Sequence, residues 1–195
     1  MDRRSARTDK LLKDALIKLM NEKGFEKISV KDLTEEADIN RATFYLHYKD
    51  KYDLLEQFEK KILMEMNEIK ENIAKNYPNN FILPSDKERL SPVFVFVYSY
   101  IKENAAFMKV VLGPNGDLRF QMQIKNFIED SFAENMAIYH KIDKAYLKYV
   151  ATVASSAQLG VIQKWLSTGM KETPEELASI VSEVIGAIYN MLVNH

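Results

Sequence analysis

Apolar residues recur every three or four positions along most of the chain, which is the spacing of one face of an α-helix. The longest uninterrupted stripe follows Asp50 and continues to about Asn76. Its members are Leu55, Phe58, Ile62, Met66, Ile69 and Ile73. We predict a helix of about 27 residues here, and its length of roughly 40 Å is enough to connect two structural modules.

Capping residues divide the remaining chain into further helices. Ser91–Pro92 and Thr173–Pro174 each offer an N-cap followed by proline at the first helical position, and Glu176 completes a capping box. Gly24 and Gly169 are suited to end helices. We expect helices at about 5–23, 30–37, 41–48, 50–76, 91–104, 105–112, 118–139, 144–167 and 174–194. No segment is a convincing strand, so the predicted fold class is all-α with about nine helices.

Two of these expected helices lie close together in the sequence. Ser29 is placed to cap the first, with Asp32 as its capping-box partner, and Asn40 is placed to cap the second. Only residues 38–40 separate them, and Asp38 tolerates the left-handed backbone that a tight turn needs. Two short helices joined by about three residues form a helix-turn-helix.

The second helix of this pair carries side chains that suit DNA. Arg41, Thr43, Tyr45 and His47 can all donate hydrogen bonds to phosphates or base edges. The first thirteen residues contain five basic side chains and two acidic ones, a net charge of +3, although the formal charge of the whole chain is −1. Because basic side chains near phosphates release counterions, we expect this segment to contribute to DNA binding.

The run from Ser29 to Leu55 resembles the signature of the TetR family of transcription regulators. The most specific part is Tyr45-Leu46-His47-Tyr48 followed by Lys51. The chain departs from the family pattern at Asp38, where glycine is usual, at Thr34, where a small residue is usual, and at Tyr48, where phenylalanine is usual. Asp38 would bring a negative charge near DNA.

The resemblance implies a domain organisation and a set of DNA contacts. It implies a DNA-binding domain at 1–50, a linking helix at 51–76, and an effector-binding and dimerisation domain at 77–195. The implied DNA-binding residues are Ser29, Arg41, Ala42, Thr43, Tyr45, His47 and Lys51. Arg41 and Ala42 match positions that face the bases, whereas most of the others match phosphate-contacting positions.

The C-terminal part carries a second, less specific resemblance. The pattern from Gly160 through Trp165 to Leu177 is similar to the C-terminal region of a TetR-type subgroup that includes regulators of dihydroxyacetone kinase genes. This resemblance implies a homodimer in which the helices at 144–167 and 174–194 pack against their mates. It also implies a small-molecule effector that releases a repressor from a palindromic operator.

Aromatic residues are frequent between residues 81 and 165, where an effector pocket would lie. Most of them are expected to form core. Tyr98, Tyr149 and Trp165 combine an apolar body with a polar tip, so we select them as candidate pocket residues.

Composition excludes several other classes of protein. The chain has no cysteine, which excludes disulfides and thiolate metal sites. His47, His140 and His195 lack ligands at metal spacing, and no phosphate loop or nucleophile motif is present, so we expect no metal, no cofactor and no enzymatic activity. No apolar run has the length of a membrane span, and the N-terminus is not a signal peptide, so we expect a cytoplasmic protein.

One alternative remains open from the sequence. A TetR-like coactivator would act through protein contacts with little or no DNA binding, and Asp38 and the near-neutral charge of the DNA-binding module are compatible with that role. The two hypotheses differ in salt dependence, because phosphate contacts weaken steeply as the salt concentration rises.

Overall fold

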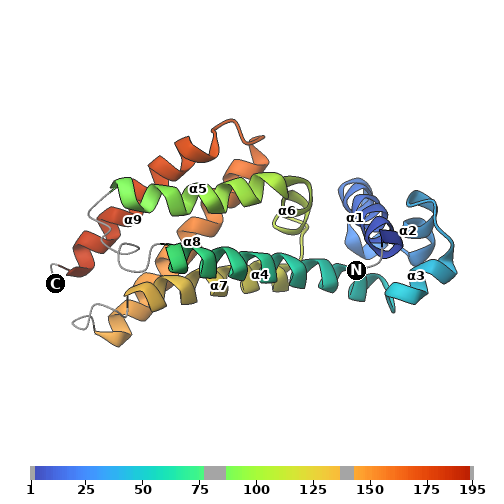
Figure 1. Ribbon diagram of the computed structural model, residues 1–195, viewed down its shortest axis with the longest axis horizontal. Coiled ribbons are helices and arrows are strands. Elements are labelled where there is room, and N and C mark those ends of the chain that lie inside the picture. The colour runs from blue at the N-terminus through green and yellow to red at the C-terminus, as the bar shows by residue number, and fades with distance from the viewer. Residues whose placement is uncertain (1–2, 77–86, 137–142, 194–195) are drawn as a thin grey trace.

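The computed structural model describes residues 3–76, 87–136 and 143–193, and all regular structure within these ranges is helical (Figure 1). The elements are α1 (Arg3–Lys23), the short 3-10 helix η1 (Phe25–Lys27), α2 (Val30–Glu36), α3 (Arg41–His47), α4 (Lys51–Asn76), α5 (Lys87–Glu103), α6 (Ala105–Val111), α7 (Leu118–Met136), α8 (Lys144–Ser167) and α9 (Pro174–Val193). The predicted all-α class is confirmed, and the described residues contain the nine expected α-helices.

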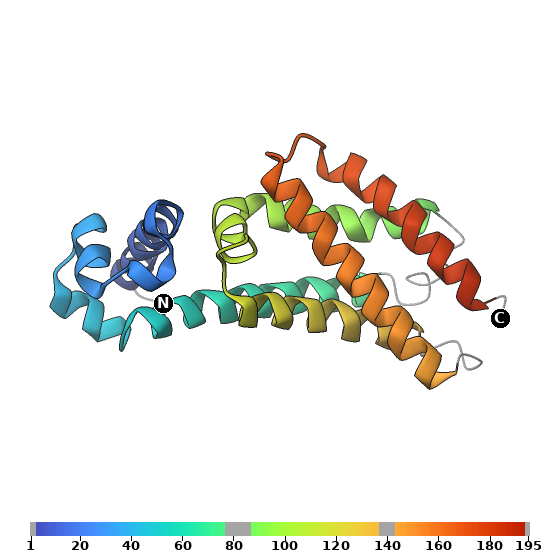
Figure 2. The same ribbon diagram turned by 180° about the vertical axis from the view of Figure 1, so that it is seen from behind.

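Two groups of helices are joined by α4. Helices α1, α2 and α3 form a head at one end of the molecule, and α4 leaves this head and runs lengthwise into the group formed by α5 to α9 (Figures 1 and 2). Within that second group, α5 packs along α9, and α7 packs along α8. The 26 residues of α4 agree with the long helix predicted from the apolar stripe.

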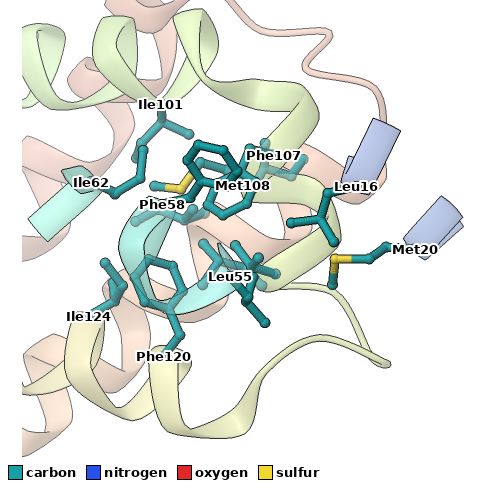
Figure 3. Close-up of a cluster of buried hydrophobic side chains, with 14 of the residues drawn as sticks. Leu16, Met20, Leu55, Phe58, Ile62, Ile101, Phe107, Met108, Phe120 and Ile124 are labelled. Carbon is teal, nitrogen blue, oxygen red and sulfur yellow. The ribbon is translucent and has the colours of Figure 1, made fainter. Parts of the chain in front are cut away.

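A continuous apolar core connects the head to the second group. Figure 3 shows side chains from α1, α4, α5, α6 and α7 meeting in one cluster, and the labelled ones are Leu16, Met20, Leu55, Phe58, Ile62, Ile101, Phe107, Met108, Phe120 and Ile124. Phe58 of α4 meets Phe107 of α6 edge-on, with ring centroids 6.1 Å apart. Movement of α4 relative to α6 or α7 would therefore have to repack this cluster.

The predicted start of α5 is wrong. The expected N-cap and first helical residue, Ser91 and Pro92, both lie inside the helix, which begins at Lys87. Residues 87–90 are Lys, Glu, Arg and Leu, which are strong helix formers. Proline removes only one backbone hydrogen bond at this point, within the second turn, so the upstream residues extend the helix past it.

Other expected boundaries agree or fall partly outside the described residues. The predicted end of α7 at Tyr139 and the last residue of α9, Asn194, lie outside that part, and so do Lys141 and Ile142 of the expected turn. Helix α3 ends at His47 rather than one residue later. None of the described helices is long and apolar enough to cross a membrane.

Candidate nucleic-acid interface and ligand cavity

Local caps fix the first helix of the pair. Ser29 Oγ accepts a hydrogen bond from the backbone N–H of Asp32 at 3.2 Å, and the backbone N–H of Ser29 donates to the Asp32 carboxylate at 2.7 Å. The predicted capping box is thus present. The Ser29 hydroxyl also donates to the Asp32 carboxylate at 2.7 Å, and this bond, with the ion pair from Lys23 at 2.9 Å and the bond from the Ser29 backbone N–H, holds the pKa of Asp32 far below its ordinary value. Ser29 is exposed, so its hydroxyl lies at a surface that also includes the start of α2.

A tight turn then directs the second helix. Asp38 adopts a left-handed backbone with a φ of 50°, as its position in the turn predicts. The backbone N–H of Ile39 donates to the carbonyl of Thr34 at 3.0 Å, which closes the end of α2. Asn40 Oδ1 accepts from the backbone N–H of Ala42 at 2.8 Å and so caps α3 as predicted.

Helix α3 has one face in the core and one in solvent. Phe44 is fully buried and packs against the rest of the head. The opposite face exposes Arg41, Ala42 and Tyr45, whose exposed fraction is 52%. Thr43 and His47 lie at the border of this face and are half-buried. The structure therefore brings five of the seven predicted DNA-binding residues onto or beside a single accessible surface of α3.

Leu46 belongs to the same face and was not selected from the sequence. Its exposed fraction of 83% is unusually high for a leucine in a helix next to a buried core. Leu46 follows Ala42 by four residues, which places both on one side of α3. The sequence contained a signal for the exposure of Leu46. It lies two positions after Phe44 on the same helix, so the two side chains cannot both face the core.

Contacts between helices hold this surface in place. The Tyr48 hydroxyl donates to the Asp9 carboxylate at 2.9 Å, which ties the residue after α3 to α1. Burial and this carboxylate raise the pKa of Tyr48 well above its ordinary value, so the hydroxyl keeps its proton. Lys18 of α1 pairs with Glu36 of α2 at 2.7 Å. Contacts with α1 therefore hold α2 and the end of α3 in place.

Lys51 has partners within the protein. Its ammonium donates to the carbonyls of Phe25 at 3.1 Å and Glu26 at 2.9 Å, and it lies 4.9 and 5.0 Å from the ring centroids of Phe25 and Tyr52. An ammonium has three donors, so one remains for another acceptor. Lys51 is the first residue of α4 and therefore does not belong to the exposed face of α3.

The basic N-terminal segment is helical rather than a tail. Helix α1 begins at Arg3. Lys13 points to the second group of helices, because its ammonium lies 3.4 Å from Asn104 Oδ1 and 5.3 Å from the ring centroid of Phe107. Burial lowers the pKa of Lys13. One of the five basic residues therefore contributes to the junction between the two groups of helices.

A mostly apolar cavity of about 180 Å³ lies between helices of the second group. Helices α4, α5, α7, α8 and α9 line it through Met66, Ile69, Lys70, Ile73, Val93, Phe94, Val97, Tyr100, Ile101, Phe127, Ile128, Ser131, Phe132, Ala154, Gln158, Ile162 and Ile185. Such an apolar lining with a few polar groups is typical of sites for small organic ligands. We refer to it as the bundle cavity.

The three pocket residues selected from the sequence do not line the bundle cavity. Tyr98 and Trp165 are buried in the core, where their ring centroids lie 5.7 Å apart. Trp165 Nε1 donates to the carbonyl of Glu172 at 3.1 Å. Tyr149 lies on the surface, with an exposed fraction of 71%. Tyr98 does reach the cavity indirectly, since its hydroxyl accepts a hydrogen bond at 2.9 Å from Gln158, which lines it.

Helices α8 and α9 present apolar side chains to solvent. Tyr146, Tyr149 and Val153 follow each other on α8 at helical spacing, and Ile180 and Val184 do so on α9. A Cβ atom added at Gly160 on the exposed side of α8 would meet no neighbour within 4 Å. In the described part of the chain, no group of three or more His, Cys, Asp and Glu residues is arranged to hold a metal ion.

Two family profiles match the chain. Residues 12–58 match the family described as bacterial regulatory proteins of the tetR family, and residues 88–186 match a transcriptional regulator C-terminal region of the same group. Among sequence relatives, the HTH-type transcriptional regulator YxbF of Bacillus subtilis is 26% identical over 183 residues, which cover 89% of this chain but 43% of that protein. An HTH-type regulator of Staphylococcus aureus (strain COL) is 24% identical over 136 residues, covering 68% and 67% of the two chains.

Several solved structures share the fold. A TetR-like regulator from Rhodococcus sp. RHA1 has a TM-score of 0.68 at 14% identity and covers 96% of this chain and 97% of its own. The regulator FadR of Bacillus subtilis, solved in complex with stearoyl-CoA, has a TM-score of 0.63 at 18% identity, with 91% and 97% covered. The dihydroxyacetone kinase operon activator DhaS has a TM-score of 0.55 at 17% identity, with 96% and 97% covered.

Proposed function

The chain belongs to the TetR family of bacterial transcription regulators, and from this premise we propose that it is a homodimer that binds palindromic operator DNA through α2 and α3. The observation that carries this proposal is the exposed face of α3, on which Arg41, Ala42 and Tyr45 lie together. A helix of this kind fits the major groove of B-DNA. The division into a DNA-binding part at 1–50, a linking helix and an effector part at 77–195 is part of the same proposal.

Each predicted DNA-binding residue receives a role. Arg41 and Ala42 face the base edges, and Leu46 joins them as an apolar contact for a thymine methyl group. The hydroxyls and imidazole of Ser29, Thr43, Tyr45 and His47 bond to phosphates and set the register. Lys51 offers its one remaining donor to a phosphate while it holds the carbonyls of η1.

The exposed apolar residues of α8 and α9 support dimerisation through these helices. An isolated stripe of this kind would leave Tyr149, Val153, Ile180 and Val184 in water. Pairing α8 and α9 with their mates in a four-helix bundle buries the stripe. A two-fold dimer then presents two α3 helices to successive major grooves, about 34–36 Å apart.

The bundle cavity is proposed as the effector site. Met66, Ile69, Lys70 and Ile73 belong to α4, which also begins beside α3, so a ligand in the cavity contacts the helix that carries the head. The similar fold of FadR, solved with stearoyl-CoA, supports an apolar ligand. A ligand that prefers the conformation with poorly spaced heads would release the DNA and relieve repression.

A mobility shift with the DNA upstream of the protein's own gene, at several salt concentrations, tests the DNA-binding role. We expect a specific shift whose affinity falls steeply with salt. Tyr45→Phe should weaken binding to all operator variants similarly, whereas Arg41→Ala should change the preference among them. Arg119→Ala, an exposed arginine far along the chain on α7, is the control. Equal losses for Tyr45→Phe and Arg41→Ala across the panel would contradict the assigned roles.

A coactivator that acts through protein contacts is the second candidate. The exposed Asp38 in the turn before α3 and the fold shared with the operon activator DhaS favour it. Absence of a specific shift at low salt, together with salt-insensitive binding to a protein partner in a pull-down, would support this candidate over the first.

A further inference from the structure

Gln158, one of the residues that line the bundle cavity, carries a polar atom without a partner in the described part of the chain. Among the residues that the structure describes, Gln158 Oε1 is buried and accepts no hydrogen bond, although Gln158 lines the cavity and is only 5% exposed. The other end of the same amide is held, because Nε2 donates to the Tyr98 hydroxyl at 2.9 Å. Buried polar groups normally have partners, so an orphaned acceptor on a residue that lines an apolar cavity points to a position where a ligand can bond.

The remaining polar side chains of the cavity are already engaged. Lys70 pairs with Glu134 at 2.6 Å, the Tyr100 hydroxyl donates to Glu65 at 2.7 Å, and Ser131 Oγ donates to a backbone carbonyl of its own helix at 2.7 Å. A water molecule needs two to four polar partners to be held in a cavity. Few free polar groups are left to hold a water molecule beside Gln158 Oε1. A ligand that donates a hydrogen bond to this atom would therefore meet little competition from water.

We propose that the bundle cavity binds an uncharged amphiphile, with an apolar body of about six to ten non-hydrogen atoms and one hydroxyl or N–H group that donates to Gln158 Oε1. The size follows from the volume of about 180 Å³, since an engineered apolar cavity of about 150 Å³ holds benzene. Tyr98 is a positioning residue that fixes the amide. Ligand binding itself does not depend on the proposed function, whereas the effect of the ligand on DNA affinity rests on it.

A carboxylate is disfavoured at this position. Its charge would face Gln158 Oε1, which is an acceptor, and thirteen of the seventeen lining residues are aliphatic, aromatic hydrocarbon or methionine side chains. Burial of a charge without a partner is far more costly than burial of a hydroxyl that has one. Lys70, the one cationic residue of the lining, pairs with the Glu134 carboxylate at 2.6 Å, so its charge is already balanced.

Two isomers provide a sharp test. Heptan-1-ol and 1-methoxyhexane have the same atoms and nearly the same shape, but only the alcohol donates a hydrogen bond. Binding to the intact protein is measured by calorimetry and by the fluorescence of Trp165, the sole tryptophan, which packs on Tyr98. We expect the alcohol to bind about tenfold more tightly than the ether, the effect of one satisfied neutral hydrogen bond.

Substitutions assign the preference to one atom. Gln158→Met keeps the length of the side chain and removes the amide, so the tenfold preference should disappear while both isomers still bind. Tyr98→Phe should reduce the preference, because the amide loses its anchor. Ser131→Ala is the control, since its hydroxyl bonds within α7, and the preference should persist.

The outcomes separate this inference from the proposed function. Equal affinity for the two isomers, tighter binding of heptanoate than of heptan-1-ol, or no binding of the alcohol would overturn the inference. Upstream DNA is included in the same samples. A preference for the alcohol without any change in DNA affinity supports the inference and refutes the effector role. Equal release of DNA by both isomers supports the effector role and refutes the inference.

Discussion

Glu59 provides a test of how burial controls the stability of this fold. It lies on α4 with 2% of its surface exposed, and no described residue donates a hydrogen bond to its Oε1. Burial raises the pKa of Glu59 to about 8, from an ordinary value of 4.5, and the nearby Asp117 adds to this effect while Arg119 opposes it. The carboxyl group therefore keeps its proton at neutral pH in the folded protein.

The sign of the pH dependence follows directly. Between pH 4.5 and about pH 8 the folded state holds a proton that the unfolded state has lost. The contribution of Glu59 to stability is therefore complete below pH 4.5 and declines as the pH rises to about 8. One pKa unit corresponds to about 1.36 kcal/mol, so the full shift sets an upper value of about 5 kcal/mol, and relaxation around the charged group makes about 2–4 kcal/mol the expected loss.

Glu59→Gln removes the titration and keeps the shape of the side chain. We expect equal stability of the two proteins at pH 4.5, and a variant more stable by about 2–4 kcal/mol at pH 8.5. For a chain of this length that difference raises the melting temperature by about 4–16 °C. Calorimetric melting at intervals of half a pH unit measures it.

A matched control lies on the same helix. Glu68 is exposed on α4, so Glu68→Gln should change stability by less than about 0.5 kcal/mol at every pH. The reasoning is refuted if the difference between Glu59→Gln and the unsubstituted protein is the same at pH 4.5 and pH 8.5.

Three further perturbations address the proposed DNA-binding and dimer surfaces. In the unsubstituted protein, replacement of one operator thymine by uracil should weaken binding about fivefold, because the methyl contact with Leu46 is lost. In Leu46→Ala the same replacement should have no effect, and mobility shift measures both affinities. Phe44→Ala should destabilise the head by about 3–5 kcal/mol, because a fully buried ring leaves a cavity, and hydrogen exchange of α1 to α3 would reveal it. Val153→Asp should weaken the dimer by about 2–5 kcal/mol, whereas Val153→Ala should not, and sedimentation equilibrium distinguishes the two.

Local signals in the sequence predicted the local structure well. The capping box of Ser29 and Asp32 and that of Thr173 and Glu176 both form, because their partners are three residues apart and need no tertiary contact. The apolar stripe of α4 predicted the length of the helix because helical periodicity is also a local pattern. The start of α5 was predicted wrongly from Pro92, because proline is compatible both with the first position of a helix and with its second turn. The preceding residues also favour helix, so the sequence pattern does not distinguish the two.

Sites that depend on packing were less accessible to sequence reasoning. Tyr98 and Trp165 were selected for their polar tips, yet both tips are satisfied inside the core, and the cavity forms elsewhere. The sequence did contain a signal for the two buried polar groups. Glu59 follows Leu55 by four residues, and Gln158 follows Ala154 by four, so each interrupts an apolar stripe at a position that should face the core.

The length of α4 makes it a lever. Its 26 residues span about 39 Å, with the head at one end and the residues that line the bundle cavity near the other. In the proposed two-fold dimer, a tilt of α4 by about 5° at the cavity, accompanied by repacking around Phe58, would displace the far end of the helix by about 3 Å, and opposite movements of the two heads would change their separation by about 6 Å. That is about a sixth of the distance between successive major grooves, so under the proposed function a small tilt beside a ligand would take both α3 helices out of register with DNA.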